Sequence, residues 1–331
     1  MFDITTFGSA TRDNFLKLKK ESHQIIKSGK FLTGEGLCFS LGSKIEIDDM
    51  VISTGGGGAN TAVTFALQGF KVAYVGKIGD DKRGEAIMED LEKFGVNTRF
   101  IIKDKVIPSA YSVILSSGVS QTSILVYRGA CHFLKKNDIP INKLKSRWFY
   151  LAPLKGKLLD SFGFLVNYAK KNNIKIMANI GKDQIGLDKR KLKLILSKID
   201  ILSLNQEEAS LLTGVPFQQE KALFKKLDKI IKGIAIMTKG KKGVVVSDGK
   251  YMWSAPSFSV PVQDATGAGD AFSSGFLSGL IKTDNVSFAI KLGLANSISC
   301  IGEIGAKNGL LKGIKSPYLK KIRVKKIKLW S

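Results

Sequence analysis

The chain has 331 residues, of which 52 are lysine or arginine and 28 are aspartate or glutamate, so its formal charge is +24. Hydrophobic residues make up 44% and charged residues 24%, which excludes a disordered, collagen-like or disulfide-scaffold chain. Three separated cysteines and two histidines offer neither a CxxC nor an HExxH metal site.

The sequence gives no sign of a membrane or export segment. No apolar run approaches the roughly 18 to 20 residues that cross a bilayer. The first residues, MFDITTFGSA, lack the basic start and long apolar block of a signal peptide. We therefore expect a cytoplasmic protein without a membrane partner.

The excess of basic residues is spread along the whole chain. Only seven of these residues are arginine, whereas nucleic-acid surfaces usually concentrate arginine and lysine on one face. We interpret the charge as a compositional bias of the solvated surface and expect no specific nucleic-acid partner. A nucleic-acid-binding protein remains the alternative from a different class.

Strand-like and helix-like segments alternate along the chain. Short apolar segments typical of buried strands occupy 2–8, 71–78, 147–152, 174–180, 199–204 and 233–238. Segments with helical spacing lie between them at 58–69, 83–94, 157–171, 188–198 and 206–213. This order predicts a three-layer α/β/α fold with a mostly parallel central sheet and helices on both faces.

Two segments break the alternation. Residues 31–54 and 110–128 alternate with period two and carry turn glycines, which predicts half-exposed hairpins. We expect them to pair into a small β lid on a single domain, 1–318. The basic tail, 319–331, alternates enough to form a covering edge strand with its lysines outward.

The first glycine cluster comprises Gly55 to Gly58, followed by Ala59, Asn60 and a helix-like segment. Glycines allow the backbone to approach a ligand closely; the alternative explanation is a flexible turn into a helix. The pattern is not GxGxxG, and the parallel strand comes after it, so a Rossmann interpretation is weak. No Gly-Lys pair is followed by Ser or Thr, which excludes a Walker A loop.

The second cluster, DATGAGDAF, begins at Asp264 and leads into a helix-like segment. Small residues at a helix start expose unpaired N–H groups, which form an anion site. A lone Asp270 in the first turn would simply stabilise the helix. Beside a phosphate-sized anion site, the same carboxylate could take a proton from a hydroxyl that attacks the phosphate.

These motifs together resemble the ribokinase-like (PfkB) carbohydrate kinases. DATGAGD resembles the family's second signature, and GGGGAN with the later GKIGDDKRGE resembles the first. Further matches follow in family order over about residues 5 to 311: Gly8 with Asp13, Tyr127 to Ala130, Asn205 to Glu208, Thr238 to Gly243, and Gly305 with Ala306. The resemblance implies a ribokinase-like fold and an ATP-dependent phosphotransferase that acts on an alcohol group.

The resemblance also implies roles for the phosphoryl-transfer residues. Asp270 would be the catalytic base, and Gly267, Ala268 and Gly269 would donate N–H groups to the γ-phosphoryl group. Asn205 and Glu208 would help to hold Mg²⁺ through water, although helix capping competes as an explanation. The remaining positions implied are nucleotide contacts at Thr238, Gly240, Gly243 and Asn296, and a monovalent cation such as K⁺ near Asp264. Asn296 could instead be a helix surface residue, and Asp264 a helix cap.

On the acceptor side, the resemblance places sugar hydroxyls against Asp13, Gly55, Gly56 and Asn60. Thr11, Gly57 and Cys131 depart from the ribokinase pattern, so the sugar stays unassigned. We expect a kinase that phosphorylates a primary hydroxyl of a sugar. The alternative enzyme is a nucleoside kinase, in which Phe39, Tyr111 or Phe133 would form an apolar wall for a base; otherwise these aromatics pack the lid. An apolar lid face would also allow a homodimer.

Overall fold

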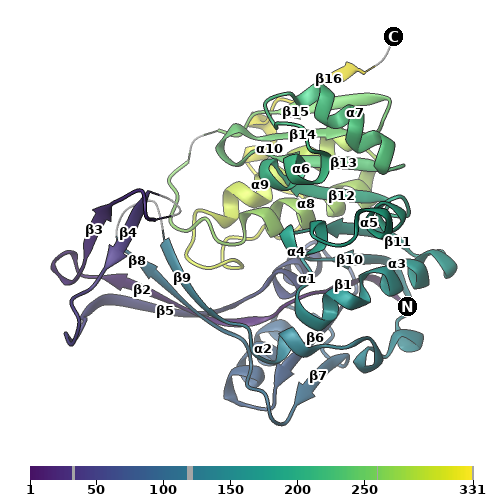
Figure 1. Ribbon diagram of the computed structural model, residues 1–331. Coiled ribbons are helices and arrows are strands. Elements are labelled where there is room, and N and C mark those ends of the chain that lie inside the picture. Colours follow the sequence, from purple (N-terminus) through teal and green to yellow (C-terminus); the bar gives the residue numbers. More distant parts are fainter. Residues whose placement is uncertain (32–33, 118–121, 259, 330–331) are drawn as a thin grey trace.

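A ten-stranded sheet runs through the molecule, as the computed structural model shows for residues 1–31, 34–117, 122–258 and 260–329 (Figure 1). Its strands, in spatial order, are β16 (Lys325–Lys328), β15 (Tyr251–Ala255), β14 (Val244–Ser247), β13 (Ile234–Thr238), β12 (Ile201–Asn205), β11 (Lys175–Asn179), β10 (Ser146–Leu151), β1 (Phe2–Phe7), β6 (Val72–Gly79) and β7 (Ile101–Asp104). The strands from β13 to β7 are parallel, and β14, β15 and β16 extend one edge with antiparallel pairing.

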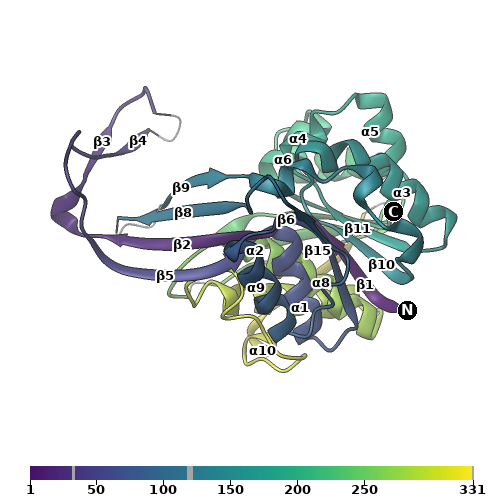
Figure 2. The same cartoon turned by 90° about the horizontal axis from the view of Figure 1, so that it is seen from below.

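Helices cover both faces of this sheet (Figure 2). One face packs against α1 (Gly57–Leu67), α2 (Lys82–Lys93), α8 (Ala268–Thr283) and α9 (Val286–Cys300). The other face packs against α3 (Phe162–Lys171), α5 (Lys189–Leu196), α6 (Gln206–Thr213) and α7 (Glu220–Ile230). Two short helices, α4 (Lys182–Ile185) and α10 (Tyr318–Lys321), complete the set of α-helices in the described residues.

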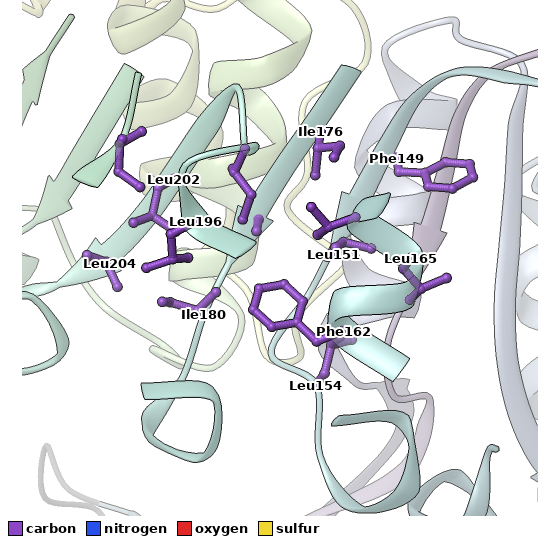
Figure 3. Close-up of a cluster of buried hydrophobic side chains, with 14 of the residues drawn as sticks. Phe149, Leu151, Leu154, Phe162, Leu165, Ile176, Ile180, Leu196, Leu202 and Leu204 are labelled. Carbon is purple, nitrogen blue, oxygen red and sulfur yellow. The ribbon is translucent and has the colours of Figure 1, made fainter. Parts of the chain in front are cut away.

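The parallel strands are apolar on both faces because both faces are covered. In β10, Phe149 and Leu151 point toward α3 and join the cluster drawn in Figure 3, whereas Tyr150 between them joins the cluster on the opposite face. Ile176 of β11 and Leu202 of β12 extend the first cluster along the sheet (Figure 3). These strands therefore form a rigid frame for the residues that follow their carboxyl ends.

A second sheet of four strands projects from one end of the central sheet (Figure 2). Its order is β5 (Ile47–Gly55), β2 (Thr11–Leu18), β8 (Tyr111–Ser116) and β9 (Thr122–Tyr127). Beyond it lies a two-stranded ribbon of β3 (Gln24–Lys27) and β4 (Glu35–Cys38). Several apolar side chains on the outer strands are about half exposed, among them Met50, Ile52 and Leu125.

The main sheet confirms the expectation of a three-layer α/β/α fold. Each predicted strand corresponds to a strand from β1 to β13, and each predicted helix to a helix from α1 to α6; residues 157–161 of the third predicted helix form 3₁₀ turns instead. The tail contributes β16, which pairs antiparallel with β15 at the sheet edge. Residues 32–33, 118–121 and 330–331, which belong to the predicted lid and tail, lie outside the described residues.

The expectation of a hairpin within 31–54 is wrong. Strand β4 pairs with β3 upstream of it, and β5 pairs with β2, which the sequence analysis did not predict as a strand. The eight residues of β2 pair with β5 along their whole length, whereas β4 has only four residues to offer. Strand β5 therefore has a longer ladder with β2 than β4 could offer it.

No helix in the described part of the chain is long and apolar enough to cross a membrane.

Candidate active site

The two glycine clusters meet at the carboxyl ends of β1 and β10, where ligands bind in open α/β sheets. Helices α1 and α8 begin there and pack against each other. Asn60 in the first turns of α1 donates a hydrogen bond from Nδ2 to Oδ2 of Asp270 in the first turn of α8, at 2.9 Å. Two motifs 210 residues apart in the sequence thus share one carboxylate.

The turn before α1 requires glycine. Gly56 has φ of +95°, and a Cβ on it would lie 2.5 Å from the carbonyl oxygen of Ser9. That oxygen accepts the backbone N–H groups of Gly58 and Ala59 at 3.1 and 3.2 Å. The close packing holds the glycine turn against the segment that follows β1.

Asp13 of β2 is buried beside this turn. A Cβ on Gly55 would overlap with its carboxylate, so the two residues are in direct contact. Burial raises the pKa of Asp13, opposed by the hydroxyls of Thr11 and Ser112 and by the charge of Lys307. Oδ1 of Asp13 and Oδ1 of Asn60 are buried and accept no hydrogen bond from the described residues. Two such acceptors suit a ligand with several hydroxyl groups.

The start of α8 has the geometry of an anion site. Gly267 caps the helix with φ of +79°, and a Cβ on it would overlap with the side chain of Ala306. The N–H of Ala268 donates to the carbonyl of Ala265 at 3.3 Å, and the N–H groups of Gly267 and Gly269 have no acceptor among the described residues. Free donors at a helix start attract an anion.

Asp270 stands beside these donors and is half-buried. Burial raises the pKa of its carboxyl group, and the hydrogen bond from Asn60 opposes that shift. Because Asn60 occupies Oδ2, Oδ1 is left for a ligand. Oδ1 faces Gly57, on which a Cβ would lie 3.4 Å away.

Asp264 connects two loops. Its Oδ1 accepts the N–H of Thr266 at 2.9 Å, and its Oδ2 accepts the N–H of Gly305 at 3.1 Å. The carboxylate therefore ties the turn before α8 to the loop that follows α9. It does not cap α8, since Gly267 occupies that position.

Asn205 and Glu208 form a capping box at the start of α6. Oδ1 of Asn205 accepts the N–H of Glu208 at 2.9 Å, and Oε2 of Glu208 accepts the N–H of Asn205 at 2.8 Å. Burial raises the pKa of Glu208, and its Oε1 has no hydrogen-bond partner in the described ranges. Those ranges contain no group of three or more His, Cys, Asp and Glu residues that could hold a metal.

The structure brings the Asn205 and Thr238 motifs together. The two residues are directly paired in register at the carboxyl ends of β12 and β13. The turn after Thr238 contains Gly240, with φ of +53°, and Gly243, with φ of +92°. This turn and the start of α6 therefore lie side by side at one edge of the site.

Asn296 is not at this edge. It is fully buried in α9, so the alternative that it is a helix surface residue is wrong. Its Nδ2 donates to the carbonyl of Ala271 at 2.8 Å, and its Oδ1 accepts the N–H of Leu311 at 2.9 Å. The side chain links α8, α9 and the loop at Leu311, and it exposes no surface to a nucleotide.

Part of the pocket that Asp270 lines could not be predicted from the sequence. This pocket has a volume of about 290 Å³, and its other polar or charged lining side chains are those of Ser9, Arg128, Cys131, His132 and Lys155. Arg128 belongs to a motif already noted, whereas nothing in the sequence singles out Lys155. A second pocket of about 450 Å³ adjoins the first, shares Arg128 and His132 with it, and adds Ile107, Tyr127 and Phe133.

Lys307 was also missed. It is 3% exposed and makes an ion pair with Asp90 of α2 and a hydrogen bond to Thr54 of β5. Burial lowers the pKa of Lys307, and the nearby carboxylate of Asp90 opposes this. The sequence shows only one more lysine in a lysine-rich chain.

Comparisons with known proteins agree with this geometry. The profile described as "pfkB family carbohydrate kinase" matches residues 23–312. Ribokinase of Haemophilus influenzae is 29% identical over 323 residues, covering 93% of this chain and 94% of that protein. Deoxyribokinase of Salmonella typhi is 30% identical over 295 residues, covering 87% and 89%. The structure of Arabidopsis thaliana ribokinase complexed with ribose and ATP superposes with a TM-score of 0.76 at 21% identity, covering 97% and 98%.

Proposed function

Since the chain belongs to the pfkB family of carbohydrate kinases, we propose that it transfers the γ-phosphoryl group of ATP to a primary hydroxyl of a sugar, with Asp270 as the base. The observation that carries this proposal is the hydrogen bond between Asn60 and Asp270. On one side of the Asp270 carboxylate are two buried oxygens that accept no hydrogen bond, Oδ1 of Asp13 and Oδ1 of Asn60. On the other is the start of α8, with N–H groups that have no acceptor among the described residues.

Asp270 takes the proton from the attacking hydroxyl through Oδ1, while Asn60 fixes the orientation of the carboxylate through Oδ2. The pKa of Asp270, raised by burial, makes the carboxylate a stronger base. The N–H groups of Gly267, Ala268 and Gly269 hold the phosphoryl group, with the Ala268 N–H exchanging its long bond to Ala265 for the ligand.

Asp13, Gly55, Gly56 and Asn60 bind the sugar in this proposal. The unpaired oxygens of Asp13 and Asn60 accept its hydroxyls, and the glycine turn lets the sugar lie close to the backbone. Residues 31–54 and 110–128 act as a lid on the 1–318 domain and exclude water from the transfer. The same sheet leaves apolar side chains exposed, which supports a homodimer formed through the lid.

Thr238, Gly240 and Gly243 contact the nucleotide phosphates, and Asn205 and Glu208 hold Mg²⁺ through water. The free Oε1 of Glu208 fits this role, since Mg²⁺ keeps much of its hydration shell. When bound, the ion neutralises charge on the phosphates. Asp264 serves chiefly to tie the two loops. A monovalent cation such as K⁺ would have to share the carboxylate oxygens of Asp264 with the backbone N–H groups of Thr266 and Gly305.

The test is an ADP-release assay across free sugars, sugar acids, sugar phosphates and nucleosides. Asp270→Asn should keep ATP affinity and lose about 10² to 10⁴ in kcat, because the base is removed and the shape kept. Asp284→Asn, at the exposed far end of the same helix, is the control and should leave kcat unchanged. Near-native turnover by Asp270→Asn would remove Asp270 from the role of base.

A nucleoside kinase is the second candidate, and one observation favours it. The second pocket is lined by Ile107, Tyr127 and Phe133, which could hold the base of a nucleoside next to the sugar site. Of the other aromatics considered, Tyr111 stacks on Arg83, and neither Tyr111 nor Phe39 lines either of the two pockets described above. Phosphorylation of nucleosides but not of free sugars in the same panel would establish this alternative.

A further inference from the structure

The pocket that Asp270 faces has a wall of basic side chains. Arg128, His132 and Lys155 line it, and Asp270 is its one acidic lining residue in the described part of the chain. Arg128 directly follows β9 and His132 lies in the 3₁₀ helix after it, whereas Lys155 follows β10. The fold therefore brings charges from two separate segments to one side of the pocket.

The backbone under these side chains is tightly fixed. Gly156, next to Lys155, has φ of +57°, and a Cβ on it would lie 2.6 Å from Cγ of His132. The loop after β10 thus packs directly against the 3₁₀ helix Gly129–Phe133. Gln184, which is fully buried, accepts the N–H of Leu154 at 3.0 Å and holds the loop from the other side. The backbone that carries the basic side chains is therefore held in place by close packing and a buried hydrogen bond.

Within the described residues, two of these three side chains lack a hydrogen-bond or ion-pair partner and the third has a weak one. The guanidinium of Arg128 makes no ion pair or hydrogen bond with any residue that the structure describes. Among the residues that the structure describes, Lys155 forms one ion pair, with Asp183 at 3.9 Å, and both side chains are about half exposed. Nδ1 of His132 is buried, and it too lacks a hydrogen-bond partner among the described residues.

Cys131 supplies no negative charge to balance them. Burial raises the pKa of its thiol to about 11, although Arg128 and Lys155 both act against this shift. The thiol is therefore neutral at physiological pH. Its Sγ donates to the carbonyl of Arg128 at 2.9 Å and so stabilises the turn that carries the arginine.

The wall faces the acceptor rather than the donor. The glycines that line the same pocket are Gly8, after β1, and Gly57, in the acceptor-side turn. Gly267, Ala268 and Gly269, which are proposed to hold the transferring phosphoryl group, do not line it. The proposed sugar residues Asp13, Gly55, Gly56 and Asn60 do not line it either, but Gly57 directly follows two of them. The positive charges therefore lie next to the proposed acceptor site.

We propose that the acceptor carries an anionic group, a carboxylate or a phosphate, which Arg128 and Lys155 bind while its hydroxyl faces Asp270. This inference rests on the proposed kinase function and narrows the acceptor to sugar acids or sugar phosphates. A guanidinium binds either anion through two parallel hydrogen bonds, and a lysine adds a point charge. A neutral sugar would leave the Arg128 guanidinium without a partner and Lys155 with only its long, half-exposed ion pair to Asp183.

The experiment measures acceptor binding to the full chain by calorimetry without ATP, so that no turnover occurs. One arm uses aldonic and 2-keto aldonic acids, a second uses sugar phosphates, and a third uses the corresponding neutral sugars. At least one anionic ligand should bind roughly tenfold or more tightly than its neutral counterpart. Arg128→Gln and Lys155→Met should each weaken that binding by about 10- to 100-fold, as expected for hydrogen bonds to charged groups.

Lys157→Met is the matched control, because Lys157 is exposed two residues further along and does not line the pocket. It should change the affinity by less than about twofold, since a distant surface charge is screened by salt. Arg128→Lys, which keeps the charge without the planar fork, should lose less affinity than Arg128→Gln. Equal affinity for neutral and anionic ligands, no anionic binding, or unchanged affinity in Arg128→Gln and Lys155→Met would each overturn the inference.

The ADP-release assay separates this inference from the proposed function. Efficient transfer to neutral sugars, insensitive to Arg128→Gln, would refute the anionic acceptor and leave Asp270 as the base. A raised KM for ATP with an unchanged KM for the acceptor would show that the cations serve the donor and would also refute it. Tight binding of an anionic ligand without ADP release from any acceptor would support the site and refute the kinase proposal.

Discussion

At the start of α8, replacing glycine by alanine should have opposite effects on stability at two neighbouring positions, Gly267 and Gly269. Gly267 has φ of +79°, and a Cβ on it would overlap with the side chain of Ala306. Gly269 has no positive φ, and a Cβ on it would meet nothing within 4 Å. Gly267→Ala should therefore destabilise the protein, whereas Gly269→Ala should leave its stability unchanged or slightly raised.

The magnitude follows from two contributions at Gly267. An alanine in the left-handed region costs about 1 to 2 kcal/mol, and overpacking costs about 1 to 3 kcal/mol, so the free energy of unfolding should fall by about 2 to 5 kcal/mol. The unfolding entropy of a chain of 331 residues is about 0.7 kcal/mol per kelvin. Gly267→Ala should thus lower Tm by about 3 to 7 °C.

Both variants should lose activity, for different reasons. Gly267→Ala must shift the turn, and a misplacement of about 1 Å can cost roughly a hundredfold in rate. Gly269→Ala adds a methyl group in open space in the first turn of α8, beside the N–H groups that are proposed to bind the phosphoryl group, and should lower kcat tenfold or more at unchanged Tm.

Thermal unfolding and ADP release on the two purified variants provide the measurement. A Tm for Gly267→Ala within about 1 °C of the parent protein would refute the steric reasoning. Full activity of Gly269→Ala would show that no phosphoryl group approaches that residue.

Three further predictions concern pH, charge and the lid. The hydrogen bond from Asn60 lowers the pKa of Asp270, and the Asp270 carboxylate must be ionised to accept a proton. Asn60→Ala should therefore move the acid limb of the kcat/KM pH profile to higher pH. An unmoved midpoint of that limb would contradict this prediction. Duplex DNA should bind only weakly and lose affinity steeply with salt; nanomolar binding at physiological salt would instead favour a nucleic-acid function. Hydrogen exchange at 31–54 and 110–128 should slow with the correct acceptor and not with nucleotide alone, whereas equal protection with and without the acceptor would argue against a lid.

The central sheet could be predicted because its strands are covered on both faces. A strand such as β12 is buried at four of its five positions, so it stands out as an apolar run. Strand β2 could not be found in this way, since its sequence TRDNFLKL mixes charged and apolar residues. Its strand state depends on β5 and β8, its neighbours on either side, which the local sequence does not show.

The glycine motifs were predictable for a similar reason. Gly56 and Gly267 need a positive φ and close packing, and that requirement leaves a visible pattern in the sequence. The burial of Asn296 leaves no such pattern, because a single asparagine in a helix does not show from the sequence whether it is buried or exposed. The pocket wall also escaped prediction, since Arg128 and Lys155 come from separate segments that line one pocket only in the folded chain, where Gly156 packs against His132.

Lys307 shows how the two halves of the site are joined. Its ammonium group binds Thr54, the residue before the first glycine cluster, and Asp90 of α2. Two residues earlier, the N–H of Gly305 binds Asp264, which begins the turn leading into α8. The loop that carries Gly305 and Lys307 therefore contacts both glycine clusters. Because these contacts are largely buried, a displacement of either cluster would break a buried hydrogen bond or ion pair, which favours movement of the two clusters as one unit.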